Sequence, residues 1–406
     1  MIFWIELILG AEKSDEISRL CKNERVALIS NDRSRVKDMR SSFHALKNSV
    51  QIKRILSPEH GYHGDHQAGI PSEDSFDSDL KVHIFSLYKE SGKEEYSSSG
   101  DLDKKMRSED TQDAGKFPSN EAIEGIDAIL FDLQDVGTRV YTYISTMLYS
   151  MKASILYGKR FVVLDRPNPI TGIIREGPVL EYPKYSSFIG PGPIPLRHGL
   201  TVGELALFFN EKLLSGKCNL NVVRMDGWKR NTWYDETGLP WVSPSPNIPT
   251  ISTATAYPGA VMLEGTNVAE GRGTTNPFLT LGAPWVDGFK ASSFLNELKI
   301  PGVKTIPVRF RPTFSKYSGQ LCVGVEVFVL DRKDFRAFQF YTAVIQYLHD
   351  EYPDFSFYGD YFDRVCGGRM IRDKILNGDT LVEIMESVGQ GISLFNDEIR
   401  DYELYK

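Results

Sequence analysis

The sequence has few cysteines, no long apolar run and no excess of basic residues. Its four cysteines lie far apart and form no CxxC pair, so we expect free thiols rather than disulfides or a zinc site. No stretch approaches the roughly 20 apolar residues that a membrane-spanning helix needs, which argues against a transmembrane protein. The formal net charge is −7 and no polybasic run is present. We therefore expect no nucleic-acid partner, because such a partner is held mainly through its phosphates.

The short signatures of several enzyme classes are also missing. No GxGxxG follows an expected strand, and GxxxxGK[ST], HExxH and GxSxG are absent, so dinucleotide, ATP and serine-esterase chemistry lose their main support. The most metal-like segment is EHGYHGDH at residues 59–66. Its two glycines make it a loop, and no second cluster of ligands accompanies it. We therefore expect no metal and no other cofactor.

The chain begins with an apolar stretch, MIFWIELILG, that contains Glu6 and lacks the basic n-region of a signal peptide. We therefore expect a first strand or helix there. This interpretation favours a cytoplasmic location.

Three apolar, β-branched runs end abruptly in polar side chains beside turn residues, at 50–61, 126–137 and 160–169. In an open α/β sheet, ligands bind outside the carboxyl ends of the parallel strands. We therefore expect the polar residues at these ends to converge on one site. They are Glu59, His60, Asp132, Asp135, Asp165, Arg166 and Asn168.

The remaining pattern predicts a doubly wound α/β domain followed by a smaller one. We expect further strands at 25–30, 82–88, 220–225 and 322–330, and helices at 141–157, 201–214 and 335–349. The second helix starts with a capping box, Thr201 and Glu204, which gives Glu204 a structural role. The stretch 189–199 is too rich in proline and glycine for regular structure, and 88–118 is a polar insertion. We place the domains at 1–255 and 256–406, with the site in the cleft between them.

Acidic side chains are the best candidates for catalysis. Glycoside hydrolysis usually needs two carboxyl groups, one protonated and one ionised, and five acids lie in glycine-punctuated motifs: Glu59, Asp132, Asp135, Glu264 and Glu270. Four arginines share these motifs, namely Arg139, Arg166, Arg197 and Arg272. Guanidinium groups grip carboxylates in a bidentate fashion, so an anionic substrate would explain them, although ion pairs that brace loops would explain them equally well.

Eight motifs, taken in order, resemble one family. They are SPEHGYHG, FDLQDVGTRVYTYIS, VVLDRPNPITG, EGPVL, IPLRHGLTVGELA, WVSPSPNIPT, YPGAVMLEGTNVAEGRGTTNPF and LGAPW. In this order they resemble the NamZ-type exo-β-N-acetylmuramidases of peptidoglycan recycling, from about Val26 to the C-terminus. The resemblance implies a glycoside hydrolase that releases a terminal β-1,4-linked N-acetylmuramic acid from the non-reducing end of fragments of the MurNAc-GlcNAc type. It also implies a Rossmann-like N-terminal domain, a smaller α/β (α+β) C-terminal domain and a cleft between them.

The resemblance also suggests roles for individual residues. It makes Glu59 the candidate for the catalytic acid, with His60 beside it to tune or position it. The second catalytic group is left open among Asp132, Asp135, Glu264 and Glu270. The lactyl carboxylate of the substrate would be held by Arg139, Arg166, Arg197 or Arg272. Further candidates for substrate binding in these motifs are Tyr141, Asn168, His198, Asn247 and Asn267.

Some alternatives stay open at this point. Many members of the family carry an export signal, so a periplasmic or exported location is compatible with the resemblance. A non-catalytic protein that binds peptidoglycan fragments, or a metal-dependent amidase or esterase using the loop at residues 60–66, would be the other functions. The sequence does not choose between retention, inversion and assistance by the 2-acetamido group of the substrate.

Overall fold

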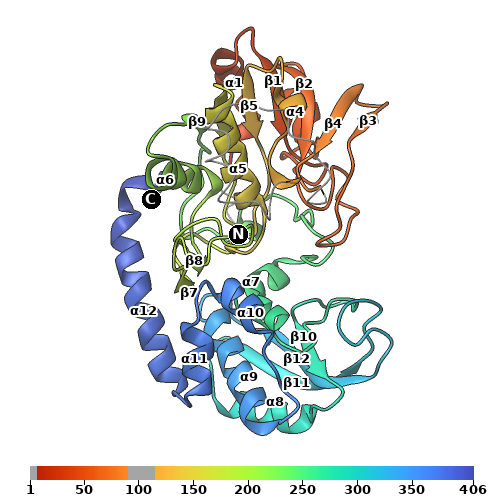
Figure 1. Ribbon diagram of the computed structural model, residues 1–406, viewed down its shortest axis with the longest axis vertical. Helices are drawn as coiled ribbons and strands as arrows, with labels where there is room; N and C mark the ends of the chain where they lie inside the picture. The colour runs from red at the N-terminus through yellow and green to blue at the C-terminus, as the bar shows by residue number, and fades with distance from the viewer. Residues whose placement is uncertain (1–6, 90–114) are drawn as a thin grey trace.

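The computed structural model describes residues 7–89 and 115–406, which form two domains stacked end to end (Figure 1). The larger, N-terminal domain is built on a seven-stranded sheet in the order β3-β4-β2-β1-β5-β6-β9. Neighbouring strands run parallel except at the edge, where β3 pairs antiparallel with β4. The strands are β1 (Arg25–Ile29), β2 (Gln51–Ser57), β3 (Ser75–Asp77), β4 (Val82–Ser86), β5 (Ala128–Phe131), β6 (Arg160–Leu164) and β9 (Asn219–Val223). This topology confirms the expected doubly wound α/β fold.

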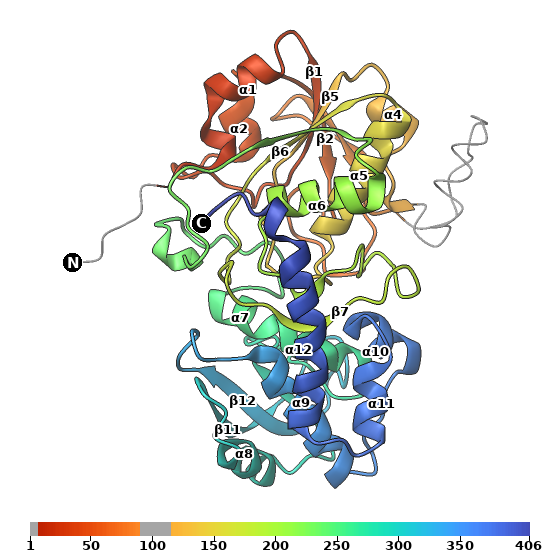
Figure 2. The same ribbon diagram turned by 90° about the vertical axis from the view of Figure 1, so that its left-hand side faces the viewer.

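Helices cover both faces of this sheet, because alternate residues of each strand point to opposite sides. On one side lie α1 (Ser14–Leu20) and α2 (Ser42–Leu46), and on the other α4 (Asn120–Ile123), α5 (Tyr143–Leu156) and α6 (Val202–Leu214), as Figure 2 shows. Val26 and Leu28 of β1 belong to the hydrophobic cluster of α1 and α2. Ala27 and Ile29 belong to the cluster of α4, α5 and α6. The strand is therefore buried on both faces.

The two long helices of this domain begin and end within two residues of the predicted bounds. Helix α5 is followed by Gly158, whose φ of +62° is left-handed and suits glycine. At the start of α6, the Thr201 hydroxyl accepts the Glu204 N–H at 3.2 Å, and the Glu204 carboxylate accepts the Thr201 N–H at 3.0 Å. The capping box is confirmed, and it gives Glu204 a structural role.

The smaller domain packs helices on a three-stranded antiparallel sheet in the order β10-β12-β11. Its strands are β10 (Thr280–Ala283), β11 (Val303–Phe310) and β12 (Cys322–Val329). Its helices are α7 (Ile251–Ala260), α8 (Gly288–Glu297), α9 (Ala337–Glu351), α10 (Gly359–Cys366) and α11 (Met370–Leu376), with a short 3-10 turn, η4 (Val261–Gly265), after α7. The expected strand at 322–330 and helix at 335–349 are confirmed.

The end of the chain returns to the N-terminal domain. Helix α12 (Leu381–Glu398) runs alongside both domains (Figure 2), and η5 (Arg400–Tyr402) follows it. The Tyr405 hydroxyl then donates to Asp165 at 2.6 Å, and the Leu404 N–H donates to Glu204 at 2.9 Å. Because the chain crosses between the domains more than once, the division at residues 255 and 256 stays a proposal.

A two-stranded antiparallel ribbon, β7 (Glu176–Val179) and β8 (Pro195–Arg197), lies near the junction of the domains. The prediction that 189–199 holds no regular structure was therefore wrong for residues 195–197. Proline is tolerated at the first residue of such a strand, because it removes a donor only at the end of the ladder.

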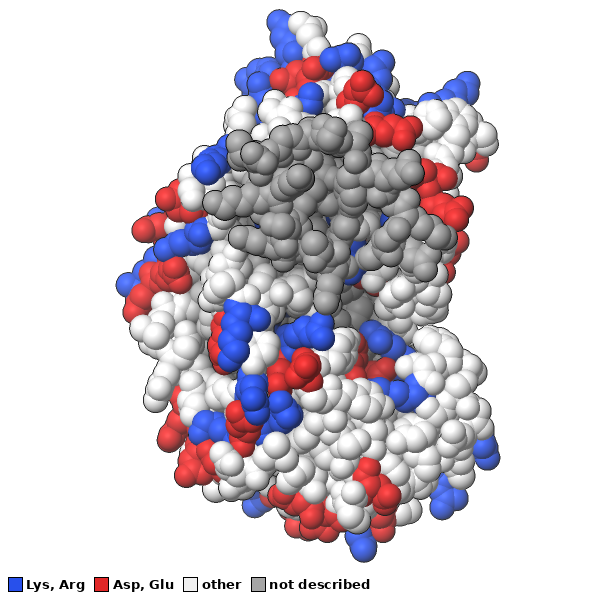
Figure 3. All heavy atoms as spheres, in the orientation of Figure 1, with Lys and Arg blue, Asp and Glu red and all other residues white. Residues whose placement is uncertain are grey.

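Two segments for which the sequence made predictions are described only in part, the apolar start and the polar insertion. Residues 1–6 of the apolar start and residues 90–114 of the polar insertion lie outside the described residues. In the apolar start, Gly10–Glu12 forms the 3-10 turn η1. A second 3-10 turn, η3 (Tyr234–Glu236), lies later in the chain. No helix within 7–89 and 115–406 has the length and apolar character to cross a membrane. On the face in Figure 3, the acidic and basic side chains are interspersed rather than gathered by sign.

Candidate active site

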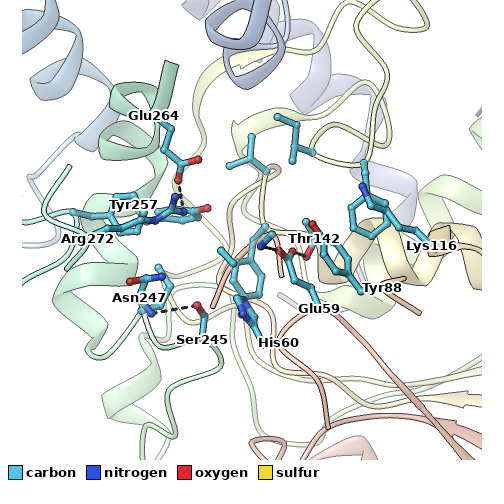
Figure 4. A pocket seen from close by; sticks show the side chains of 18 of the residues that line it. Glu59, His60, Tyr88, Lys116, Thr142, Ser245, Asn247, Tyr257, Glu264 and Arg272 are labelled. Carbon is cyan, nitrogen blue, oxygen red and sulfur yellow. Dashed lines mark hydrogen bonds and ion pairs between the residues drawn. The ribbon is translucent and has the colours of Figure 1, made fainter. Parts of the chain in front are cut away.

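A cavity of about 270 Å³ lies where the two domains meet, and residues of both domains line it. From the N-terminal domain come the loop after β2 and the segment that enters α5. From the C-terminal domain come α7, η4, α10 and the loop that follows η4. Figure 4 shows these side chains on opposite walls of the cavity. The carboxyl end of β2 thus opens onto the cavity, as the position of a site in an open α/β sheet predicts.

Glu59 is a buried carboxylate on the N-terminal wall of this cavity. It lies two residues beyond the end of β2 and is only 6 % exposed. One carboxylate oxygen accepts the Gly69 N–H at 2.7 Å, and the other accepts the Thr142 hydroxyl at 2.6 Å. Thr142 is the N-cap residue of α5, but its side chain does not cap the helix. Two donors from different segments therefore fix the direction in which the Glu59 carboxyl points.

His60 lies beside Glu59 with a fixed tautomer. Its backbone is left-handed, with φ of +75°, and its ring Nδ1 lies 2.9 Å from the carbonyl oxygen of His66. Since a carbonyl only accepts, Nδ1 carries the proton and Nε2 is left with a lone pair. Burial lowers the pKa of His60, against the opposing effect of the neighbouring Glu59 carboxylate. Burial therefore favours the neutral ring of His60, whose lone pair is at Nε2.

The opposite wall carries a cluster of two acids and two bases. Glu264 pairs with Arg272 at 2.6 Å and accepts the Tyr361 hydroxyl at 3.0 Å. Behind it, Glu270 pairs with Lys316 at 3.0 Å and lies 3.9 Å from Arg272. Burial raises the pKa of Glu264 and lowers that of Lys316. The formal charges of the cluster balance, so this wall presents polar groups without a net charge.

Aromatic rings close the space between the two walls. Tyr141 lies with its ring centroid 6.5 Å from His60, 4.7 Å from Tyr143 and 6.5 Å from Tyr257. Tyr141, Tyr257 and Asn247 line the cavity, and the Asn247 side chain donates to Gln67 at 3.2 Å. Flat apolar faces with a few fixed polar groups are suited to a small polar molecule such as a sugar.

Two family models together match most of the chain. The N-terminal model of "Exo-beta-N-acetylmuramidase NamZ" matches residues 26–252, and the C-terminal model of the same family matches residues 255–405. The chain belongs to the NamZ family. The resemblance carried by the eight motifs is therefore confirmed.

Relatives of this NamZ-family chain span nearly its whole length. It is 42 % identical over 388 residues to "Peptidoglycan beta-N-acetylmuramidase NamZ" of Bacillus subtilis (strain 168), an alignment that covers 95 % of this chain and 87 % of the relative. Crystal structures of two DUF1343 family proteins from Bacteroides fragilis NCTC 9343 share the fold. One has a TM-score of 0.85 at 33 % identity and covers 99 % of this chain and 100 % of its own. The other has a TM-score of 0.74 at 28 % identity and covers 98 % and 99 %.

The structure brings only some of the predicted site residues together in the cavity. Those that line it are Glu59, His60, Tyr141, Asn247, Glu264 and Arg272. Glu270 contacts this group from behind through Arg272 and Lys316. Asn267 lies apart, where its side chain bonds the backbone of Asp354 and Ser356 at 2.7 and 2.9 Å.

Two of the other predicted acids and two of the predicted arginines have their partners away from the cavity lining. Asp132 forms a buried ion pair with Arg166. Asp135 accepts the Gly137 N–H at 2.6 Å and lies 3.3 Å from the His198 ring. A further buried ion pair joins Arg197 to Glu176 at 2.5 Å. All of these side chains bind other groups of the protein, so we infer that they stabilise the fold around the cavity.

Asn168 and Arg139 also have internal partners. The Asn168 amide donates to the Leu200 carbonyl at 3.0 Å and accepts the Ile170 N–H at 3.1 Å. The Arg139 guanidinium is fully buried and donates only to backbone carbonyls. A position just after a strand therefore did not distinguish residues that line the cavity from residues that are buried beneath it.

Other residues that line the cavity were missed from the sequence. Thr142, directly after the predicted Tyr141, holds Glu59, and Tyr361 holds Glu264. Lys116 also lines the cavity, with its ammonium 4.4 Å from the centre of the Phe188 ring. Thr142 could have been found from its motif. Tyr361 lies outside the recognised motifs, and no feature of the neighbouring sequence pointed to it.

The histidine loop shows no metal-binding arrangement in the part of the chain that the structure describes. No group of three or more histidines, cysteines, aspartates and glutamates within 7–89 and 115–406 is placed to hold an ion. His63 lies 3.7 Å from Asp77, and His66 lies 4.0 Å from Asp65. The four cysteines are free and buried, as expected.

Proposed function

We propose that this chain removes a terminal N-acetylmuramic acid from the non-reducing end of peptidoglycan fragments, with Glu59 as the catalytic acid. The chain is a glycoside hydrolase of the NamZ type, and the relative from B. subtilis is named a peptidoglycan β-N-acetylmuramidase. The observation that carries the assignment of Glu59 is its position. It is a buried carboxyl group, fixed by two hydrogen bonds, on the wall of a cavity that both domains enclose.

Cleavage of a glycosidic bond requires a proton on the departing oxygen as the bond to the anomeric carbon breaks. In the proposed reaction, Glu59 gives this proton to the leaving sugar, and water supplies the hydroxyl of the released N-acetylmuramic acid. The Gly69 N–H fixes one oxygen of the carboxyl group. The Thr142 hydroxyl can donate to the other oxygen when it is ionised and accept from it when it is protonated. The environment thus accommodates both states of Glu59.

Among the four acids considered for the second catalytic group, Glu264 is the one that lines the cavity. We propose it for that group, on the wall opposite Glu59 in Figure 4. Its ion pair with Arg272 opposes the effect of burial, which raises the pKa of Glu264. If the 2-acetamido group of the substrate assists instead, Glu264 would serve to hold Arg272 in place. A Glu264→Gln variant that keeps near-normal kcat would favour the assisted route.

The lactyl carboxylate distinguishes N-acetylmuramic acid from N-acetylglucosamine and calls for a cation in the cavity. Two cationic side chains are found among the described residues that line it, Lys116 and Arg272. Arg272 is the member of the predicted arginine set that reaches the cavity. A cavity of about 270 Å³ is at the small end of ligand pockets, which span roughly 300–1,000 Å³. This size favours one terminal sugar over a long glycan segment.

The experiment that tests the proposal is the release of free N-acetylmuramic acid from the disaccharide MurNAc-GlcNAc, with and without EDTA. We expect release by the unmodified protein in both conditions and no release by a Glu59→Gln variant that remains folded. Binding of the disaccharide without release would instead identify a non-catalytic binding protein. Loss of release on addition of EDTA would identify a metal-dependent hydrolase.

A further inference from the structure

Arg139 differs from the other fully buried arginines in its partners. Arg166 and Arg197 each pair with a carboxylate, whereas Arg139 forms no ion pair with any acid that the structure describes. Burial lowers the pKa of Arg139 to about 10, so the side chain is still a cation at neutral pH. Burying a charge without a counter-ion destabilises a protein. The position of Arg139 therefore needs another explanation.

The Arg139 guanidinium connects three backbone segments from two domains. One terminal nitrogen donates to the carbonyls of Pro178 and Ile194, both at 2.8 Å. Pro178 lies in β7, and Ile194 directly precedes β8. The other donates to the carbonyl of Val365 at 2.9 Å, in the last turn of α10. The C-terminal carbonyls of a helix carry partial negative charge, so this is a favourable place for a cation. Arg139 thus ties α10 of the C-terminal domain to the N-terminal domain.

The contact between Arg139 and α10 is close. Helix α10 ends at Cys366, and its C-cap residue, Gly367, has a left-handed φ of +85°. A Cβ atom at this position would lie 2.7 Å from the Arg139 guanidinium and 2.9 Å from the Leu180 Cα, and both distances are too short for unbonded atoms. The guanidinium therefore fits against the helix end with no room for a side chain between them.

The segment that contains Arg139 and the helix that it binds, α10, both contribute residues to the cavity. Three residues after Arg139, Thr142 donates to Glu59 at 2.6 Å on one wall. Within α10, Tyr361 donates to Glu264 at 3.0 Å on the other wall. The hydrogen bonds of Arg139 thus join the segment that holds the first carboxyl group to the helix that holds the second.

We propose that Arg139 is a positioning residue that sets the spacing of the two walls of the cavity. The catalytic part of this inference rests on the proposed function. A lysine would keep the charge, but its single nitrogen on a flexible stem cannot reproduce a planar fork that reaches three carbonyls in fixed directions. A misplacement of about 1 Å between reacting groups can cost on the order of 100-fold in rate. Arg139→Lys therefore keeps the positive charge and removes the hydrogen bonds of the planar guanidinium.

The test uses two variants, each with a matched control. Arg139→Lys is compared with Arg230→Lys, because Arg230 is also buried and bonds two carbonyls but lies away from the cavity. Unlike Arg139, Arg230 also pairs with Glu204 at 2.6 Å, so this control tests the loss of a buried guanidinium fork in general. Gly367→Ala is compared with Gly378→Ala. Both glycines follow a helix and are left-handed, but nothing lies within 4 Å of a Cβ at Gly378. The readouts are the melting temperature, kcat and KM on MurNAc-GlcNAc, and amide hydrogen exchange of the protein without substrate.

We expect residues 137–143 and α10 to exchange faster together in Arg139→Lys and Gly367→Ala, and to be unchanged in both controls. We also expect kcat/KM of these two variants, measured well below their melting temperatures, to fall by about tenfold or more. Unchanged exchange in α10 would overturn the inference, as would a kcat/KM within about twofold of the unmodified protein. If the unmodified protein hydrolyses nothing, the proposed function fails, and exchange alone decides whether Arg139 joins the walls.

Discussion

The hydroxyl of Thr142 offers a sharp test of how Glu59 is held, because a valine has almost the same shape without the hydroxyl. Thr142→Val removes one of the two donors to the Glu59 carboxyl and leaves the Gly69 N–H at 2.7 Å. It removes no helix cap, since the Thr142 side chain does not cap α5. The change is therefore confined to the bond with Glu59.

The size of the effect follows from the kind of hydrogen bond. The Glu59 carboxyl becomes charged as it gives up its proton, and a bond to a charged group contributes about 1.5–3 kcal/mol. Each 1.36 kcal/mol corresponds to a factor of about ten in rate. If the bond fixes the reactive direction of Glu59, Thr142→Val should lower kcat on MurNAc-GlcNAc roughly 10- to 100-fold. We expect KM to change much less, because the side chains of the opposite wall that would bind the terminal sugar are unaltered.

Thr142→Ser is the matched control, because it keeps the hydroxyl and loses only a methyl group. The assay is the initial rate of N-acetylmuramic acid release at several substrate concentrations, with thermal melting to show that each variant is folded. We expect the serine variant to stay close to the unmodified protein. Equal rates for the serine and valine variants would refute the idea that this bond positions Glu59.

Two further predictions concern the charges of the chain. Burial raises the pKa of Asp165 to about 7 from an ordinary 3.8, so the folded protein binds a proton here more tightly than the unfolded chain. Stability should then fall as pH rises from about 4 to about 7, and Asp165→Asn should flatten this part of a melting-temperature series, whereas an unchanged slope would contradict the assignment. If Lys116 or Arg272 holds the lactyl carboxylate, Lys116→Met or Arg272→Lys should reduce kcat/KM more on muramyl than on glucosaminyl substrates. Equal losses on the two substrates would exclude the altered residue from that role.

The sequence predicted the parallel sheet well, because strands buried on both faces read as short apolar runs. The run that forms β5 and the run that forms β6 are examples, and the caps Thr201 and Gly158 mark helix ends through local backbone chemistry. The return of α12 and the β7–β8 ribbon were not predicted. Both depend on packing against distant parts of the chain, which leaves little trace in local periodicity.

The candidate site was predicted in part for a similar reason. Glu59 and His60 follow β2 and line the cavity, in keeping with the strand-end position from which they were predicted. The same argument selected Asp132 and Arg166, which instead pair with each other in the interior. Sequence motifs show which residues lie at the same sheet edge. They do not show which of them face the cavity, because that depends on how far each loop extends and which partner it meets.

Arginine was the hardest residue to assign from sequence. A guanidinium can bind a substrate carboxylate, a protein carboxylate or backbone carbonyls, and the motifs look alike in all three cases. Arg197 meets Glu176, and Arg139 meets three carbonyls. Arg272 alone of the four predicted arginines lines the cavity. Only the folded arrangement separates these cases.

The most direct test of the central claim compares two leaving groups in the Glu59→Gln variant. An aryl glycoside of N-acetylmuramic acid with a nitrophenyl leaving group departs without needing a proton, whereas the sugar of MurNAc-GlcNAc needs one. If Glu59 is the acid, kcat/KM of the variant should fall far more on the disaccharide than on the aryl glycoside. Equal losses on both substrates would contradict the role of Glu59 as proton donor.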